Sequence, residues 1–216
     1  MIESIAARID PRLRKVSGKV FYSGRVAFSG TASVYVLGGN PGGDPVVKAA
    51  ETVGAHTDFV LSDAPAEWSA YCDESWGGRR IGDAPLQRRL QHLLSSLDLD
   101  PRRVPASNLV FTRSRRSADL RVDIDTLIEM CWPVHQAVLA TLRPKALICF
   151  GVGIGERVRR RLDARQHIGS FEEQNGRRWQ SHAWKTLTGL MVFGLTHPSI
   201  ANWTNLLTDP SPMVRA

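Results

Sequence analysis

The chain has 216 residues, of which 43% are hydrophobic and 23% are charged, a composition that excludes a chain disordered throughout. Lys and Arg number 28 against 21 Asp and Glu, and the resulting formal net charge of +7 favours an anionic partner such as nucleic acid. The length predicts a single domain spanning residues 1–216. Three separated cysteines without a CxxC pair predict neither a zinc site nor an iron–sulfur cluster, and they fit a reducing compartment.

The N-terminal segment does not resemble a signal peptide. Glu3 stands where positive charge is expected, and no apolar stretch follows it. No segment of the sequence has the length and apolar character of a membrane span. We therefore expect a cytoplasmic protein that does not interact with membranes.

Four short apolar runs, at 33–40, 107–114, 146–153 and 190–199, predict buried strands of a parallel sheet. Helices are predicted over 85–99, over 123–142 with a bend at Pro133, and over 155–164. The alternation predicts an α/β fold, a three-layer αβα sandwich around a central, mostly parallel four-stranded sheet, with its core at about 33–207. The irregular segment 44–82 is either a functional connection or a surface insertion with short helices.

The segments after the predicted strands are the candidate ligand-binding loops, because open α/β sheets bind ligands beyond the carboxyl ends of their strands. They read GGNPGGD (38–44), TRSRRS (112–117), GVGIGER (151–157) and THPSIANW (196–203). The first contains four glycines, which let backbone approach a ligand closely. The alternative is a tight turn in which Asn40 bonds its own backbone.

Two further readings concern the later loops. Glycines at 151, 153 and 155 approximate a dinucleotide-binding fingerprint, but Glu156 stands where its third glycine belongs. The other interpretation is that Gly151 and Gly153 let a helix start close to the sheet. His197 is either a hydrogen-bonded structural residue or a functional one, and its place at a strand end favours function.

Together these motifs resemble those of the uracil-DNA glycosylase superfamily. GGNPG (38–42) is similar to the first motif of the mismatch-specific and single-strand-selective branches, and HPSI (197–200) to the second motif. SNLVF supplies Asn108 on the intervening strand, and CFGVG follows the third strand. The resemblance covers roughly 33–207 and implies the uracil-DNA glycosylase-like fold.

The resemblance also implies roles for individual residues. Asn40 would position the attacking water, although other branches carry Asp at that place and Asp44 is a less favoured alternative base. His197 would donate a hydrogen bond to the leaving base, and Asn108 would match the edge of uracil. The strictest uracil enzymes carry Tyr where Gly42 stands, so the pocket is expected to accept thymine or 5-substituted uracils. The substrate-binding residues expected in all are Gly39, Pro41, Gly42, Phe59, Asn108 and Ser199.

Apolar residues have two expected roles. The aromatic floor beneath the base would come from Phe59, Trp68, Tyr71 or Trp76, with Phe59 preferred. Ile200 would fill the gap left by the flipped base, with Trp203 as the alternative. Equally, Ile200 could begin a helix packed on the core.

Arginines near the predicted site are candidates for phosphate contacts. Arg113, Arg115 and Arg116 form the first cluster, and Arg157 with Arg159, Arg160 and Arg161 form a second that could be an ordinary solvated face. The sequence thus predicts a monofunctional DNA glycosylase for uracil or a related base, without metal or cofactor, acting on DNA as a monomer. The alternative is a member of this fold that binds DNA or nucleotide without base release.

Overall fold

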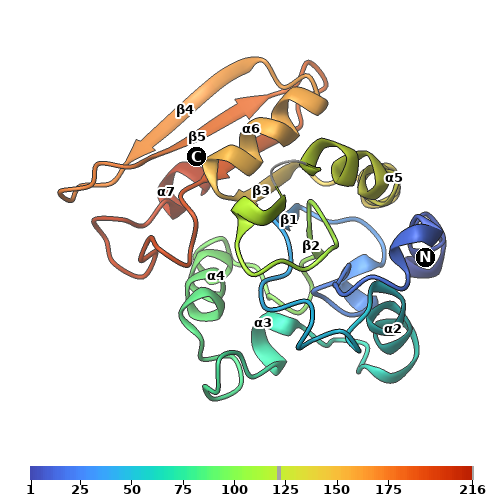
Figure 1. Cartoon of the computed structure of the whole chain (residues 1–216). Coiled ribbons are helices and arrows are strands. Elements are labelled where there is room, and N and C mark those ends of the chain that lie inside the picture. Colours follow the sequence, from blue (N-terminus) through green and yellow to red (C-terminus); the bar gives the residue numbers. More distant parts are fainter. Residues whose placement is uncertain (121–122, 216) are drawn as a thin grey trace.

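A computed structural model describes residues 1–120 and 123–215 and contains one six-stranded sheet (Figure 1). The spatial order of the strands is β2-β1-β3-β6-β5-β4. Their bounds are β1 Val34–Gly38, β2 Ala106–Asn108, β3 Ala146–Phe150, β4 Gln166–Glu172, β5 Gln180–Lys185 and β6 Met191–Leu195.

The α/β class is confirmed, but the prediction of a four-stranded sheet was wrong. The four expected strands are mutually parallel, in the order β2-β1-β3-β6. Two unpredicted strands extend the sheet beyond β6. β5 pairs antiparallel with β6, and β4 pairs antiparallel with β5, so the sheet is mixed. Every residue of β1 and β3 is buried, as the continuous apolar runs predict for strands covered on both faces.

Helices lie on both sides of the parallel strands. In Figure 1, α5 (Ile124–Leu142) and α6 (Val152–Arg161) lie above these strands, and α3 (Ala70–Asp73) and α4 (Pro85–Ser96) lie below them. These positions agree with the predicted helices 85–99, 123–142 and 155–164. The remaining helices are α1 Ile2–Ala6, α2 Val53–Asp58 and α7 Ser211–Arg215, with a π-helical turn at Phe59–Asp63 and 3₁₀ turns at Pro11–Leu13, Arg25–Phe28 and Ser117–Leu120.

The apolar run 107–114 is only partly a strand, because β2 ends at Asn108. The chain nevertheless continues beside the glycine-rich loop. The amides of Leu109 and Val110 donate to the carbonyls of Gly38 and Gly39 at 2.8 and 3.0 Å. The run is therefore buried as predicted, and it holds the loop that follows β1.

The antiparallel hairpin places its turn at the edge of the sheet where the parallel strands have their carboxyl ends. β5 runs opposite to β6, with His182 beside Gly194, so the turn that precedes β5 lies at the carboxyl end of β6. The amide of Thr196 donates to Ser181 Oγ at 2.9 Å and ties the two strands together there. Residues 173–179 are thereby brought close to the loop that contains His197.

The N-terminal segment belongs to the main core, which the expected limits of 33–207 leave out. Ile5, Leu13, Phe21 and Phe28 are fully buried in the same hydrophobic cluster as the sheet. Among the described residues, no helix combines the length and the apolar character needed to cross a membrane.

Candidate functional site

A cavity of about 910 Å³ opens at the carboxyl ends of the parallel strands. Gly38 at the end of β1, Phe150 at the end of β3 and His197 after β6 all line it. The cavity therefore lies where the strand-end rule places a ligand site. Of the site residues predicted from the sequence, it brings together Gly39, Asn40, Gly42, Asn108, Arg113, Arg115, His197 and Ser199, and its lining does not include Pro41, Phe59, Arg116 or Ile200.

The amide of Asn40 is held in one orientation. Its Nδ2 donates to the carbonyl of Pro41 and to Ser114 Oγ, both at 2.9 Å. Ser114 Oγ donates its own hydrogen to the carbonyl of Arg116, so it must accept from Asn40. The backbone bond expected of a tight turn is therefore present, but Oδ1 accepts from no described residue and can bind a water.

The ring of His197 is fixed as the neutral Nε2–H tautomer. The backbone amide of Ser199 donates to Nδ1 at 3.1 Å, and Ser199 Oγ lies 2.7 Å from the same nitrogen. An amide can only donate, so Nδ1 is the acceptor and the proton is on Nε2. Burial lowers the pKa of His197, which keeps the ring neutral near pH 7. His197 therefore offers a neutral donor to the cavity.

Asn108 presents an unpaired amide in the cavity wall. The residue is only 5% exposed, and its Nδ2 has no hydrogen-bond partner among the described residues. An unpaired buried donor is destabilising by about 1–3 kcal/mol, so a turn of the amide that brings Nδ2 into contact with a bound acceptor is favoured. Asn108 is thus placed to read a polar edge.

The aromatic wall of the cavity consists of residues other than Phe59. Tyr22 and Tyr71 stack at 5.8 Å, and Trp76 and Phe150 approach Tyr71 edge-on at 5.5 and 6.4 Å. All four line the cavity. Phe59 instead packs edge-on against Trp68 and next to His56, away from the lining residues. The preference for Phe59 as the aromatic floor therefore has no support in the geometry. Tyr71 and Trp76, the alternatives to Phe59 in the sequence analysis, do line the cavity.

Arg113 lines the cavity, but its guanidinium is bound by groups of the protein itself. Its side chain is 4% exposed and donates to Ser17 Oγ, to the carbonyl of Gly42 and, at 2.8 Å, to Glu51. A guanidinium with these partners holds the glycine-rich loop in place and has little freedom to meet phosphate. We therefore correct the expected phosphate contact at Arg113 to a positioning role.

The other arginines of the first cluster remain at the surface. Arg115 is exposed and pairs with Asp44, which holds the pKa of that carboxyl below its usual range. Asp44 is therefore poorly suited to act as a base. Arg116 is exposed beside Arg115 but outside the cavity lining.

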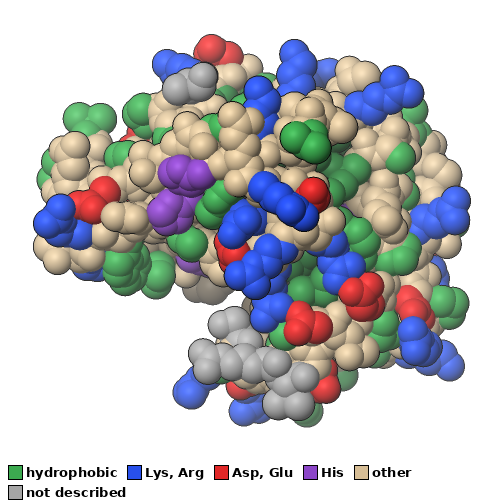
Figure 2. All heavy atoms as spheres, turned by 90° about the horizontal axis from the view of Figure 1, so that it is seen from above, with side chains coloured by type: hydrophobic (Ala, Val, Ile, Leu, Met, Phe, Trp, Pro, Cys, Tyr) green, Lys and Arg blue, Asp and Glu red, His purple; other side chains and the backbone are tan. Residues whose placement is uncertain are grey.

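The second arginine cluster lies on α6 and is matched by carboxylates. Arg157 pairs with Asp125, Arg161 with Glu129, and both Arg159 and Arg160 with Glu156. Figure 2 shows Lys and Arg side chains gathered on one face of the molecule with acidic side chains among them. The pairing agrees with an ordinary solvated helix face.

Of the two apolar candidates in the last loop, only Ile200 is accessible. Ile200 is 55% exposed, whereas Trp203 is fully buried, packs on Phe150 and donates Nε1–H to the carbonyl of Thr196. The alternative that Trp203 fills the gap in DNA is wrong. The alternative that Ile200 begins a helix packed on the core is also wrong, because the segment that follows it is irregular and Ile200, Leu206 and Leu207 are exposed.

The sequence reading missed several cavity residues because they lie in irregular segments. Lys19 and Glu74 form an ion pair at 2.9 Å, and Glu74 also accepts from Trp76 Nε1 at 2.6 Å. Glu51 is paired with Lys48 and Arg113. No periodicity or spacing distinguishes these positions in the sequence. Within residues 1–120 and 123–215, no group of three or more His, Cys, Asp and Glu could hold a metal ion.

The glycines of GVGIG serve the packing of α6. Gly151 precedes the helix with φ of +103°, and Gly155 faces Gly194 of β6, where an added Cβ would lie 2.4 Å from its Cα. Gly153 has open space around it. Gly155, rather than Gly153, lets the helix lie close to the sheet.

Comparison of the sequence with protein-family models and with curated proteins finds no match.

Proposed function

We propose that this protein is a monofunctional DNA glycosylase that hydrolyses the N-glycosidic bond of uracil or a related base. The observation that carries the proposal is the convergence of three side chains on one cavity: Asn40 with a free acceptor, His197 with a neutral donor and Asn108 with an unpaired amide. A flipped nucleotide needs a water, stabilisation of the leaving base and recognition of its edge. These three groups match those needs, on the uracil-DNA glycosylase-like fold that the motifs imply.

The proposed reaction uses water as its only co-substrate. Asn40 Oδ1 orients a water whose oxygen bonds to C1′ as the bond from C1′ to the base nitrogen breaks. The base leaves with the electron pair, and the Nε2–H of His197 stabilises the negative charge on its carbonyl oxygen. The water gives up one proton to solvent, and the departed base takes one up.

A second candidate is binding of DNA without base release. One observation favours it: both carboxylates that line the cavity, Glu51 and Glu74, are held in ion pairs with Lys or Arg. Burial opposes the ionised form of Glu51, but Lys48, Lys19 and Arg113 outweigh it and lower the pKa of its carboxyl. Glu51 therefore stays ionised and is not placed to accept a proton near pH 7.

The test is base release from labelled oligonucleotides followed by alkali cleavage. Uracil is placed opposite G, opposite A and in single strands, and thymine, hypoxanthine, xanthine and 5-hydroxymethyluracil are tested alongside. We expect Asn40→Ala and His197→Ala each to slow release by about 10²- to 10³-fold, with DNA affinity nearly unchanged.

His167→Ala is the matched control, because His167 is exposed, and this variant should release base at the wild-type rate. Release that is equally fast in Asn40→Ala would exclude the proposed role of Asn40. Absence of release from every substrate, with DNA binding intact, would establish the second candidate.

A further inference from the structure

The loop that presents Ile200 is held from two sides by arginines. Arg89 donates from Nη1 to the carbonyl of Pro198 at 2.5 Å and from Nε to Asn202 Oδ1 at 3.3 Å. Arg177 donates from Nη1 to the carbonyl of Ile200 at 3.0 Å. We name residues 198–202 the Ile200 loop.

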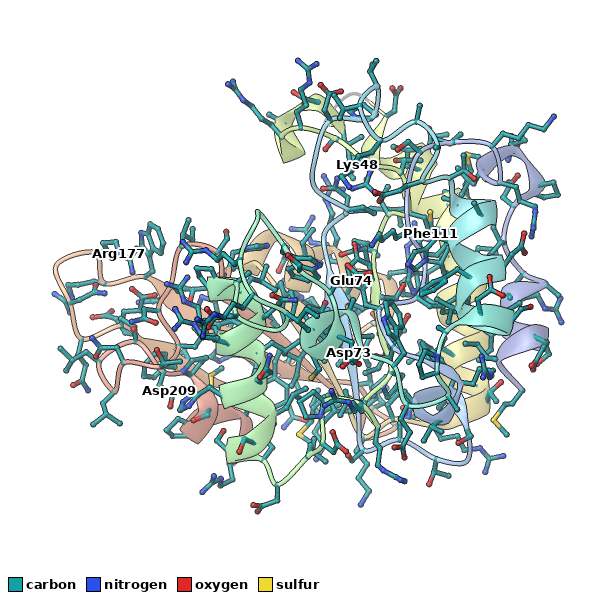
Figure 3. All side chains as sticks on the ribbon, turned by 90° about the horizontal axis from the view of Figure 1, so that it is seen from below. Lys48, Asp73, Glu74, Phe111, Arg177 and Asp209 are labelled. Carbon is teal, nitrogen blue, oxygen red and sulfur yellow. The ribbon has the colours of Figure 1, made fainter. Side chains whose placement is uncertain are left out.

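The two arginines come from elements far apart in the sequence. Arg89 lies on α4, whereas Arg177 lies on the turn between β4 and β5, which projects at the edge of the molecule (Figures 1 and 3). Neither residue belongs to the motifs that resemble the glycosylases. The hairpin exists only because β5 and β4 extend the sheet beyond β6.

Arg177 is held in place by its own neighbours. Its guanidinium stacks on Trp179 at 4.2 Å, and Nη2 donates to Glu173 at 3.1 Å. The Glu173 side chain is fully buried and also accepts from Asn175 at 2.8 Å, so it anchors the turn from within. The exposed edge of Arg177 is therefore presented in a fixed position.

Both guanidiniums have N–H groups without a partner, although Arg177 already uses Nη1 for Ile200 and Nη2 for the carboxylate of Glu173. A guanidinium has five N–H groups, and Arg89 uses only Nε and Nη1 for the contacts above. Arg89 bonds only to a carbonyl and an amide oxygen and has no carboxylate partner among the described residues. Burial lowers the pKa of Arg89, and the nearby charges of Arg88 and Arg177 lower it further. A bound anion would relieve this repulsion.

We propose that Arg89 and Arg177 form a clamp that holds the Ile200 loop outward and binds the phosphates of a DNA strand lying across it. The proposal rests on the proposed function, because it takes DNA as the ligand of the cavity beside the loop. Planar guanidiniums recognise phosphate oxygens with two parallel hydrogen bonds. The exposed Ile200 between them would contact the bases of the same strand.

The test is the salt dependence of DNA binding, measured in the Asn40→Ala background so that no substrate is consumed. Arg89→Gln and Arg177→Gln keep an amide donor for the loop carbonyl but remove the charge. Arg165→Gln is the control, because Arg165 is 84% exposed and precedes β4, at the end opposite the turn. Fluorescent duplex and single-stranded oligonucleotides of one sequence serve as probes, and thermal melting checks that each variant is folded.

Each clamp variant should weaken binding by about three- to tenfold at 0.1 M salt. The plot of the logarithm of the association constant against the logarithm of the salt concentration has a negative slope. Its magnitude should decrease by about 0.9 for duplex or about 0.7 for a single strand, the change expected for one lost phosphate contact. Arg89→Lys should retain most of the slope because it keeps the charge.

Slopes equal to that of Arg165→Gln would overturn the clamp, whether or not the wild type releases a base. A wild type that releases no base but loses slope in both clamp variants would refute the glycosylase and support the clamp. Absence of any salt-sensitive DNA binding would overturn both, and would leave an acidic protein surface as the partner of these arginines.

Discussion

At the scale of single residues, Gly38 determines where the side chain of Asn108 lies. A Cβ added at Gly38 would be 2.0 Å from Asn108 Oδ1, so the amide occupies space that any other residue at position 38 would fill. The two residues are direct neighbours across the parallel strands β1 and β2. The last residue of β1 therefore has to be glycine for Asn108 to stand in the cavity wall.

Under the proposed glycosylase function, replacing Gly38 should impair base recognition more than folding. In Gly38→Ala the Asn108 amide must rotate away, and the loss of its hydrogen bonds should reduce release of the preferred base by about ten- to hundredfold. Single-turnover release measured for Gly38→Ala, Asn108→Ala and the double variant checks this. The two changes should be far from additive, because both remove the same contact. Additive losses would mean that Gly38 acts on the cavity by another route.

Sequence reasoning predicted the residues of short local motifs and missed their tertiary partners. Asn40, Asn108 and His197 lie beside buried strands, which periodicity locates. The aromatic wall could not be assigned in the same way, because Tyr22 precedes the first predicted strand and Trp76 lies in an irregular segment. Their approach to the strand ends depends on long-range packing, which one sequence does not encode locally.

At the scale of elements, the contact between α6 and β6 depends on a pair of glycines. A Cβ on Gly155 would lie 2.4 Å from Gly194 Cα, and backbone on both sides leaves no flexible atom to move. Gly153, on the same helix, is exposed and has open space around it. The helix thus contains a glycine required by packing and another that packing does not require.

Replacing each of the two glycines by alanine should change the free energy of unfolding in opposite directions. Gly155→Ala should lower the free energy of unfolding by about 2 kcal/mol or more, because α6 must shift from the sheet. Gly153→Ala should raise it by about 0.5–1 kcal/mol, since alanine is the better helix former. Urea denaturation of both variants measures the difference. A stabilising Gly155→Ala would show that the helix is not in contact with β6.

The hairpin was the element that periodicity could not reveal. β4 is an edge strand with no fully buried residue, and β5 interleaves polar residues with Ala183 and Trp184. Three of the four predicted runs are instead nearly continuous apolar residues, a pattern typical of strands that are covered on both faces. The sequence therefore predicts the centre of the sheet well and its solvated margin poorly.

At the scale of the whole molecule, two buried histidines make the fold sensitive to acid. His135 is 1% exposed, with Nδ1 2.8 Å from the hydroxyl of Tyr35, and burial lowers its pKa to about 4. His56 is 8% exposed, neither ring nitrogen has a partner among the described residues, and burial lowers its pKa to about 3. Both rings are therefore neutral in the folded chain at pH 7.

The sign of the pH dependence follows from these lowered values. An unfolded histidine titrates near pH 6.5, so between about pH 6.5 and pH 4 the unfolded chain binds protons that the folded chain does not. The two histidines therefore do not reduce the free energy of unfolding above about pH 6.5, and they reduce it progressively as the pH decreases from about 6.5 to about 4. At pH 4 each histidine should have lowered the free energy of unfolding by about 3 kcal/mol. This is a large share of the total free energy of unfolding of a typical domain, roughly 5–15 kcal/mol.

Replacement by leucine separates the two histidines. His56→Leu removes two unpaired buried nitrogens, so it should leave stability at pH 7 unchanged or higher and reduce the loss between pH 7 and pH 4 by about 3 kcal/mol. His135→Leu should flatten the pH dependence as well, but it should destabilise the protein at pH 7 by about 1–3 kcal/mol because the buried Tyr35 hydroxyl loses its partner. Urea denaturation at both pH values measures each effect. Parallel losses of stability in wild type and His56→Leu would mean that the His56 ring is protonated as readily in the folded chain as in the unfolded chain. That outcome would contradict the burial of His56, which lies on α2 and packs next to Trp68.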